Sequence, residues 1–269
     1  MSDNVEDIAA FYNSAVEREE SRLERHQLEY DLTWRYLDQF LPPQGSVLEI
    51  GCATGMYTLG LAERGFNVTA VDMSTALLDE CKKKIVKTGF EDRVQFYKAD
   101  ARDLSPIKKI KFDAVLLMGP LYHLVEEADR RIALLQAYEH LQVGGILFSA
   151  FISRFGIMGD LLRNVPYWIE DQKDVQSILQ MGKDPDDHPR GGFRGYFARV
   201  AEICPLHESI GFQTIVMAGV EPAISADDES YNQLEGTQRR LWLDLLHSIS
   251  TEESLIGASR HLLYIGRKP

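Results

Sequence analysis

The chain has 269 residues, with 29 Lys and Arg against 41 Asp and Glu and a formal net charge of −12. This charge opposes binding to a phosphate backbone or an anionic membrane, and the densest basic run, Lys82–Lys84, lies in a segment with helical periodicity where lysines usually face solvent. The three cysteines lack metal-ligand or redox spacing, and the acidic start of the chain precedes no apolar segment, so we expect a cytoplasmic protein without a metal site, export signal or membrane anchor.

Residues 1–44 precede the first strand and have the pattern of one or two helices, Ile8–Ala15 and Glu20–Phe40. From residue 45 onward, short β-rich runs alternate with helical periodicity, which is typical of βαβ units. The expected strands are Val47–Ile50, Val68–Val71, Val94–Tyr97, Phe112–Leu117, Ile146–Ile152, Phe212–Met217 and His261–Arg267. Helices are expected from the glycine turn to Glu63, from a Ser74 cap to Gly89, from Glu126 to Leu141, where Gly144-Gly145 ends the helix, and from Val200 to Ile210.

This alternation predicts a doubly wound α/β fold with a mostly parallel seven-stranded sheet, an antiparallel last strand and helices on both faces. We expect one domain over residues 1–269, with a helical cap at 1–44 and a cofactor-binding core at 45–152. Residues 153–197 form an insertion with aromatic, arginine and glycine residues, such as the segment Arg190–Tyr196, and are expected to act as a lid. Residues 198–269 complete the core and carry a helical insertion at 221–256 with Leu234, Leu241, Leu245 and Ile249.

The turn after the first strand contains Gly51 and Gly55, which allow the backbone to approach a ligand closely. Alternatively, such a turn only connects the strand to the next helix and binds no ligand. Asp72 ends the second strand, where its carboxylate can accept both hydrogen bonds from a ribose diol or cap the next helix, although Ser74 already offers that cap. The dinucleotide pattern G-x-G-x-x-G fails at Ala53 and Met56, whereas E-x-G-x-x-x-G fits a loop that approaches an amino acid moiety.

The segment Val47-Leu-Glu-Ile-Gly-Cys-Ala-Thr-Gly55 resembles the first motif of class I S-adenosylmethionine-dependent methyltransferases. Asp72, the pair Asp100-Ala101, Phe112–Gly119 and the turn Leu141–Gly145 resemble later motifs of the family in the same order, with Val143 in place of the usual proline. The resemblance spans about residues 45–151 and the terminal strand pair. It implies S-adenosyl-L-methionine as cofactor, S-adenosyl-L-homocysteine as product, and a cofactor site made by Glu49, Gly51, Cys52, Ala53, Gly55, Asp72, Met73, Asp100, Ala101, Met118, Gly119 and Tyr12.

Several of these residues have a second interpretation from the sequence alone. Asp100 can contact the adenine amine or cap a turn, and Met73 can pack on adenine or in the core. Ala53 stands where many family members have glycine. Alanine at this position still offers its backbone amide to a ligand. Tyr12 and Arg22 lie on the N-terminal helices, which in this family often close over the amino acid end of the cofactor, but ordinary helix packing is equally compatible with both. Glu49 can hold the cofactor's ammonium group.

The loop Met118–Leu124 leaves the same edge of the sheet as the glycine turn and should face the transferred methyl group. His123 is the best placed general base, because histidine titrates near neutrality, although it can equally hold the loop through the backbone. Tyr122 can contact the substrate or pack. Arg154 and Arg194 can pair with an acidic substrate group or form ordinary salt bridges.

The same loop lacks the N-P-P-[FY] and D-P-P-Y arrangements used by related enzymes on planar nitrogens. With the negative charge, this favours methyl transfer to an oxygen, nitrogen or carbon of a small molecule, without nucleic acid or membrane. A protein or RNA methyltransferase and a noncatalytic module that binds the cofactor are the alternatives. The sequence does not indicate the oligomeric state.

Overall fold

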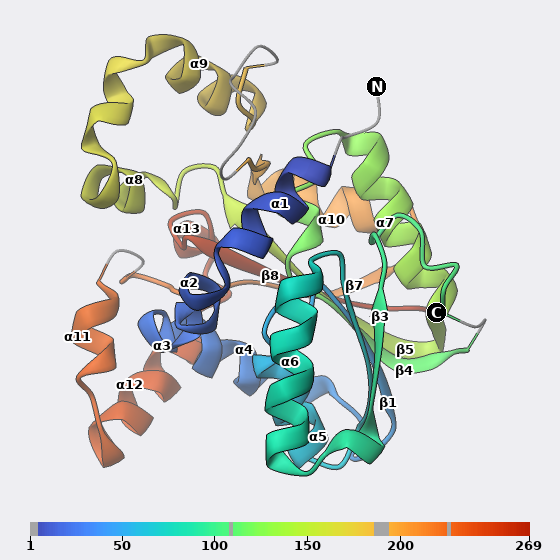
Figure 1. Cartoon of the computed structure of the whole chain (residues 1–269). Coiled ribbons are helices and arrows are strands. Elements are labelled where there is room, and N and C mark those ends of the chain that lie inside the picture. The colour runs from blue at the N-terminus through green and yellow to red at the C-terminus, as the bar shows by residue number, and fades with distance from the viewer. Residues whose placement is uncertain (1–4, 108–109, 186–193, 225–226) are drawn as a thin grey trace.

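One twisted sheet forms the centre of the molecule (Figure 1). The computed structural model describes residues 5–107, 110–185, 194–224 and 227–269. The main path of the sheet has the order β3-β2-β1-β4-β5-β8-β7, and β6 pairs with β5. The strands are β1 (Ser46–Ile50), β2 (Asn67–Asp72), β3 (Val94–Lys98), β4 (Phe112–Leu117), β5 (Leu141–Ser153), β6 (Phe197–Ala198), β7 (Gln213–Gly219) and β8 (His261–Arg267).

The strand directions confirm the predicted doubly wound fold. β1 pairs in parallel with β2 and with β4, whereas β8 runs antiparallel to both β5 and β7. The strand order reverses between β1 and β4, which places the expected ligand crevice at the carboxyl end of β1. The extra strand β6 was not predicted, because two residues are too few to show an alternating pattern.

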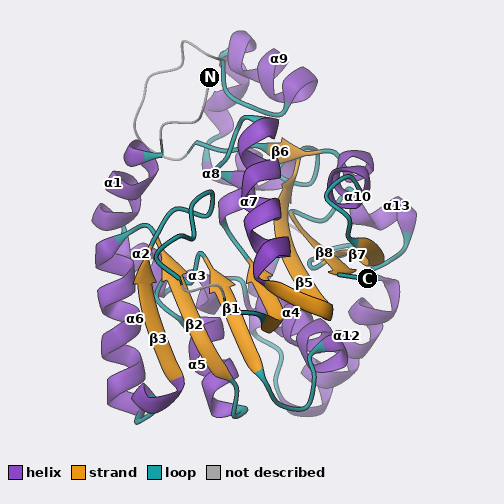
Figure 2. Ribbon diagram, turned by 90° about the vertical axis from the view of Figure 1, so that its right-hand side faces the viewer, coloured by secondary structure: helices purple, strands orange, loops and turns teal. Residues whose placement is uncertain are grey.

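Helices cover both faces of the sheet (Figure 2). One face packs on α4, α5, α6 and α12, and the other packs on α7 and α10. The helices are α1 (Glu6–Ser14), α2 (Val16–Glu20), α3 (Arg22–Arg25), α4 (Gln27–Phe40), α5 (Met56–Glu63), α6 (Thr75–Thr88), α7 (Glu127–His140), α8 (Met158–Asn164), α9 (Gln172–Met181), α10 (Val200–Glu208), α11 (Asp228–Asn232), α12 (Gly236–Ile249) and α13 (Glu253–Ile256). Three short 3-10 helices are η1 (Glu91–Arg93), η2 (Pro120–Tyr122) and η3 (Pro166–Glu170).

Two predicted boundaries are wrong. The single helix expected over residues 20–40 is divided among α2, α3 and α4, with breaks at Ser21 and His26. These breaks let Arg22 and His26 reach ion-pair partners elsewhere in the fold. Gly144-Gly145 does not end a helix: α7 stops at His140, and β5 already begins at Leu141 because this residue pairs with β4.

The insertion at 153–197 contains α8, η3 and α9, which lie beyond the carboxyl edge of the sheet (Figure 1). Its small core consists of Ile152, Ile157, Ile178 and Phe197, with Tyr122 packed against it. The insertion therefore contacts the loop after β4. Residues 190–193 of the expected Arg190–Tyr196 segment lie outside the described residues.

The predicted helix in the C-terminal insertion is present as α12, and of the apolar residues named for this insertion Leu234 and Ile249 pack against the core. Leu241 and Leu245 are 58% and 49% exposed, and Leu246 is the buried residue of this helix. Among the described residues, no helix combines the length and the apolar character needed to cross a membrane.

Candidate active site

A cavity that is partly open to solvent lies beside the carboxyl ends of β1, β2 and β4. Most of the predicted cofactor residues line it, as do both candidate catalytic residues: Glu49, Gly51, Cys52, Ala53, Asp72, Met73, Asp100, Ala101, Met118, Gly119, Tyr12, Tyr122 and His123. The cavity thus brings together residues from the N-terminal cap, the glycine loop and the loop after β4.

The glycine loop has the backbone conformation that its sequence indicates. Gly51 and Gly55 have φ angles of 83° and 82°, and a Cβ atom on Gly51 would come within 2.7 Å of the Pro120 ring. Ala53 also has a positive φ of 48°, which is costly for a residue with a side chain. Gly55 is not among the lining residues: it caps α5 and lies against Cys81, so its part in the site is to shape the loop.

Asp72 organises the loop from the end of β2. Its two carboxylate oxygens accept hydrogen bonds from the amides of Ala53, at 2.9 Å, and Ser74, at 2.8 Å. The Ala53 amide is therefore not available to a ligand, contrary to the expectation from the sequence. Ser74 provides the predicted cap of α6, with its hydroxyl accepting from the Leu77 amide. Burial raises the pKa of Asp72 to about 6, and each of its oxygens keeps a lone pair for a hydroxyl donor.

Glu49 is the second buried carboxyl group of the cavity, with 1% of its surface exposed. The Thr58 hydroxyl donates to its Oε2 at 2.5 Å. Burial raises the pKa of Glu49 to about 8, because the described surroundings provide no cation that would stabilise the charged form. An ammonium group bound beside Glu49 would provide such a cation.

His123 is held from both sides. Its Nδ1 lies 3.0 Å from the backbone oxygen of Arg194, and its Nε2 lies 2.8 Å from the Tyr12 hydroxyl. A carbonyl oxygen only accepts, so Nδ1 carries the proton and Nε2 accepts from Tyr12. Burial lowers the pKa of His123 to about 4 and raises that of Tyr12 well above its ordinary value. Both rings are therefore neutral at pH 7, and His123 is a weak base.

Asp100 lines the cavity and also holds its own turn. Its carboxylate accepts from the Arg102 amide at 2.8 Å and from the Arg102 guanidinium at 2.6 Å. Arg102 in turn binds Asp129 at 3.0 Å. The structure thus shows that Asp100 holds its turn, and the contact with adenine stays a prediction.

The two candidate substrate arginines do not line the cavity. Arg154 is 2% exposed, and its guanidinium donates to the backbone oxygens of Phe197 and Gln180 and to Glu202. These bonds attach the insertion to β5. The Arg194 guanidinium lies 3.4 Å from Asp7, while its backbone oxygen fixes His123.

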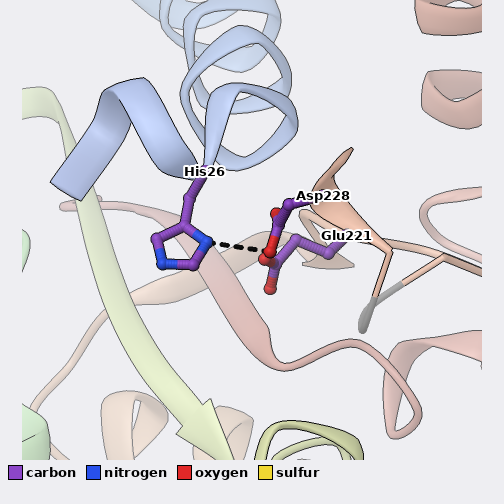
Figure 3. A group of neighbouring side chains, drawn as sticks. All are labelled: His26, Glu221 and Asp228. Atoms are coloured by element: carbon purple, nitrogen blue, oxygen red, sulfur yellow. Dashed lines mark hydrogen bonds and ion pairs between the residues drawn. The ribbon is translucent and has the colours of Figure 1, made fainter. Parts of the chain in front are cut away.

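No pattern in the sequence predicted the ion cluster beside this site, which Figure 3 shows in part. The cluster consists of His26, Glu29, Glu221, Asp228, Arg260 and His261. His26 Nδ1 lies 3.0 Å from Asp228, and His261 Nδ1 lies 3.0 Å from Glu221. The geometry of the imidazole and carboxylate groups would suit a metal ion. However, Arg260 is among them and donates to Glu221, to Asp228 at 3.1 Å and to Asp160 at 3.0 Å. Its guanidinium already supplies the positive charge that these carboxylates need.

The ion cluster reaches the cavity through Arg22. This arginine lines the cavity and donates to Glu29 at 2.8 and 3.2 Å. Glu29 lies 3.4 Å from His261. Arg22 lowers the pKa of Glu29 to about 2 against the effect of burial. Charged groups that lie far apart in the sequence therefore join the N-terminal cap to both insertions and to the start of β8.

Comparison with known proteins identifies the core. Residues 47–145 match the family model described as a methyltransferase domain. The chain is 29% identical over 252 residues to a tRNA 5-carboxymethoxyuridine methyltransferase from Escherichia coli strain K12, which covers 90% of this chain and 89% of the relative. It is 28% identical over 131 residues to a carboxy-S-adenosyl-L-methionine synthase from Aliivibrio salmonicida, covering 46% of this chain and 52% of that protein.

The fold of a SAM-dependent methyltransferase from Methanosarcina mazei matches with a TM-score of 0.60 at 16% identity, covering 87% of this chain and 96% of that one. The cavity residues also fit the cofactor, since Asp72 and Glu49 offer buried carboxyl groups without an arginine or lysine partner in the described chain. The name of the Escherichia coli relative does not support the expected exclusion of nucleic acid. Residues 47–145 form a methyltransferase domain, and the chain is an S-adenosylmethionine-dependent methyltransferase.

Proposed function

We propose that this methyltransferase acts on a small molecule whose nucleophile is already unprotonated at neutral pH, with a carboxylate oxygen as the best fit. The state of His123 carries this proposal. It is the one histidine among the described residues that line the cavity, and its Nε2 already accepts the Tyr12 proton at 2.8 Å. With a pKa of about 4, it would remove a proton from an amine or a phenol only weakly.

The remaining polar groups near this loop also argue against a general base. Burial raises the pKa of Tyr12 and that of Tyr122 well above their ordinary value, so both side chains remain neutral phenols. A carboxylate needs no base, because its own pKa lies well below 7. The chain then has only to orient the acceptor and exclude water.

Bound S-adenosylmethionine supplies a methyl group that its positive sulfur has already activated. In the proposed reaction an acceptor oxygen forms the new bond to carbon, and the electrons of the broken bond remain on sulfur. Tyr12 closes this region from α1, held by its hydrogen bond to His123. Tyr122 is fixed from the other side, because its backbone oxygen accepts from the Tyr196 amide at 2.7 Å.

The proposal is tested with methyl-labelled cofactor and a panel of small carboxylic acids, amines and phenols. We expect product that releases labelled methanol in mild alkali, as a methyl ester does. With saturating cofactor, kcat should stay constant between pH 6 and 8, because the pKa of His123 lies near 4. Alkali-stable product would contradict the carboxylate, and a kcat ionisation near pH 6.5 that disappears in His123→Gln would reassign His123 as the base.

A second candidate acceptor is a uridine in tRNA that carries a carboxymethoxy group. It is favoured by the 29% identity to the Escherichia coli enzyme, since that similarity covers 90% of this chain and so extends well beyond the methyltransferase domain at residues 47–145. The same labelled cofactor with total bacterial tRNA tests it. Alkali-labile label in nuclease-sensitive material would establish this candidate, and label confined to small molecules would exclude it.

A further inference from the structure

The hydroxyl of Tyr57 makes no hydrogen bond of normal geometry with a described residue, although only 6% of the side chain is exposed; Thr33 lies near enough to lower the pKa of Tyr57 but not to satisfy its hydroxyl. Tyr57 lies in the first turn of α5, directly after the glycine loop, and lines the cofactor cavity. Its ring packs beside Tyr30 and Trp34 of α4, with centroid separations of 5.5 and 5.9 Å. A buried hydroxyl without a partner is unfavourable, so such a group at a ligand cavity indicates that a ligand satisfies it.

The surroundings of this hydroxyl indicate what kind of group it binds. Burial keeps the pKa of Tyr57 far above its ordinary value, so the phenol always retains its proton for donation. Arg22 lines the same cavity and uses three of its five N–H groups, two toward Glu29 and the Nε group toward Glu19. A phenol and a guanidinium with N–H groups to spare are suited to an anionic oxygen.

The neighbouring residue in α5 narrows the identity of this oxygen. Thr58 donates to Glu49, the carboxyl group suited to the cofactor's ammonium. Ammonium and carboxylate are attached to the same carbon of the cofactor's amino acid moiety, so their binding groups must be neighbours. Tyr57 is compatible with this condition because it lines the same cavity as Glu49.

We propose that Tyr57 is a cofactor-binding residue whose hydroxyl donates to the carboxylate of S-adenosylmethionine, with Arg22 as the second donor. The residue then distinguishes ligands with the complete amino acid moiety from ligands that lack the carboxylate. It also stabilises this end of the cofactor without a charge of its own.

Calorimetry tests the proposal with Tyr57→Phe, which keeps the ring and removes only the hydroxyl. We expect affinity for S-adenosylhomocysteine to fall about tenfold or more, and affinity for 5′-methylthioadenosine, which has no amino acid moiety, to stay unchanged. Tyr30→Phe is the matched control, because Tyr30 belongs to the same aromatic group but does not line the cavity. Unchanged affinity for S-adenosylhomocysteine, or equal loss for both ligands, would overturn the assignment.

The unliganded protein gives a second readout. Because the Tyr57 hydroxyl makes no hydrogen bond of normal geometry in the described chain, Tyr57→Phe should unfold at the same temperature as the wild type or at a higher one. A clear decrease in melting temperature would mean that the hydroxyl serves the folded chain itself, and would overturn the proposal.

Discussion

Carboxyl groups that are shielded from solvent occur in two adjoining regions of this molecule, and their pKa values are shifted in opposite directions. In the cofactor cavity, the pKa values of Glu49 and Asp72 rise to about 8 and about 6. In the ion cluster, the pKa of Glu29 falls to about 2, and that of Asp228 is also lowered. Burial acts in the same direction on all four, so the difference comes from the partners.

Arg22 and Arg260 are those partners. Arg22 holds Glu29 with two hydrogen bonds, and Arg260 contacts Asp228 at 3.1 Å. Glu49 and Asp72, by contrast, accept from a hydroxyl and from backbone amides. The carboxylates of the ion cluster are thus neutralised by cations of the chain itself. Glu49 and Asp72 in the cavity can still accept a positive charge or further hydrogen-bond donors from a ligand. This comparison separates a region that stabilises the fold from one that binds a ligand.

The largest effect is expected when the cluster loses its cation. Arg260→Met should lower the free energy of unfolding by about 3–5 kcal/mol, because it leaves the buried Glu221 and the half-buried Asp228 with charges that are no longer compensated. Urea unfolding at pH 7 measures this, with Arg240→Met on the exposed surface of α12 as the control. A loss under about 1 kcal/mol would show that the cluster resembles a surface salt bridge.

The effect of acid pH on the free energy of unfolding in the same experiment can be predicted in sign. The folded pKa of Asp228 lies below its ordinary 3.8, so its contribution to stability is present above that pH and is lost as the pH falls through the lowered pKa. The difference in the free energy of unfolding between wild type and Arg260→Met should therefore decrease only in that acid range. Narrowing at neutral pH would contradict the assignment.

A smaller effect is expected in the cavity. Asp72→Asn should weaken binding of S-adenosylhomocysteine by about 1–3 kcal/mol, since an amide replaces one of the two oxygens available to the ribose diol. Isothermal titration calorimetry measures the change. Asp79→Asn, on the solvent side of α6, is the control, and equal affinities for wild type and Asp72→Asn would exclude the ribose contact.

The smallest expected effect is the release of a proton when the cofactor binds. In the free protein Glu49 has a pKa of about 8, so at pH 7 it is mostly protonated. An ammonium bound beside it favours the carboxylate, so cofactor binding at pH 7 should release up to about one proton, and affinity should rise with pH up to about 8. Calorimetry in buffers of different ionisation enthalpy detects this release. Its persistence in Glu49→Gln would assign the proton to another group.

The stability of the unliganded protein should show the opposite pH dependence from that of the ion cluster. The folded pKa of Glu49 lies above its ordinary 4.5, so its neutral form is the favoured one in the fold. Stability from this group is present below pH 4.5 and decreases as the pH rises toward 8. Thermal unfolding of wild type and Glu49→Gln over this range measures the difference, and parallel curves would contradict it.

The sequence by itself determined the fold class and the cofactor. Glycine spacing, a carboxylate after the second strand and strand-helix alternation are local patterns, and they place Gly51, Asp72 and Asp100 at one edge of a parallel sheet whatever the insertions do. The apolar run His261–Arg267 also predicted the strand β8 and its antiparallel direction, but not its place between β5 and β7.

Only the tertiary structure decided the rest. His123 was a reasonable base by position, but its tautomer and lowered pKa depend on Tyr12 and on the Arg194 backbone, which are distant in the chain. Arg154 was a reasonable substrate ligand, but the insertion returns over it and occupies its donors. Hydrogen bonds and burial depend on which segments meet in space, and no spacing within one segment encodes that.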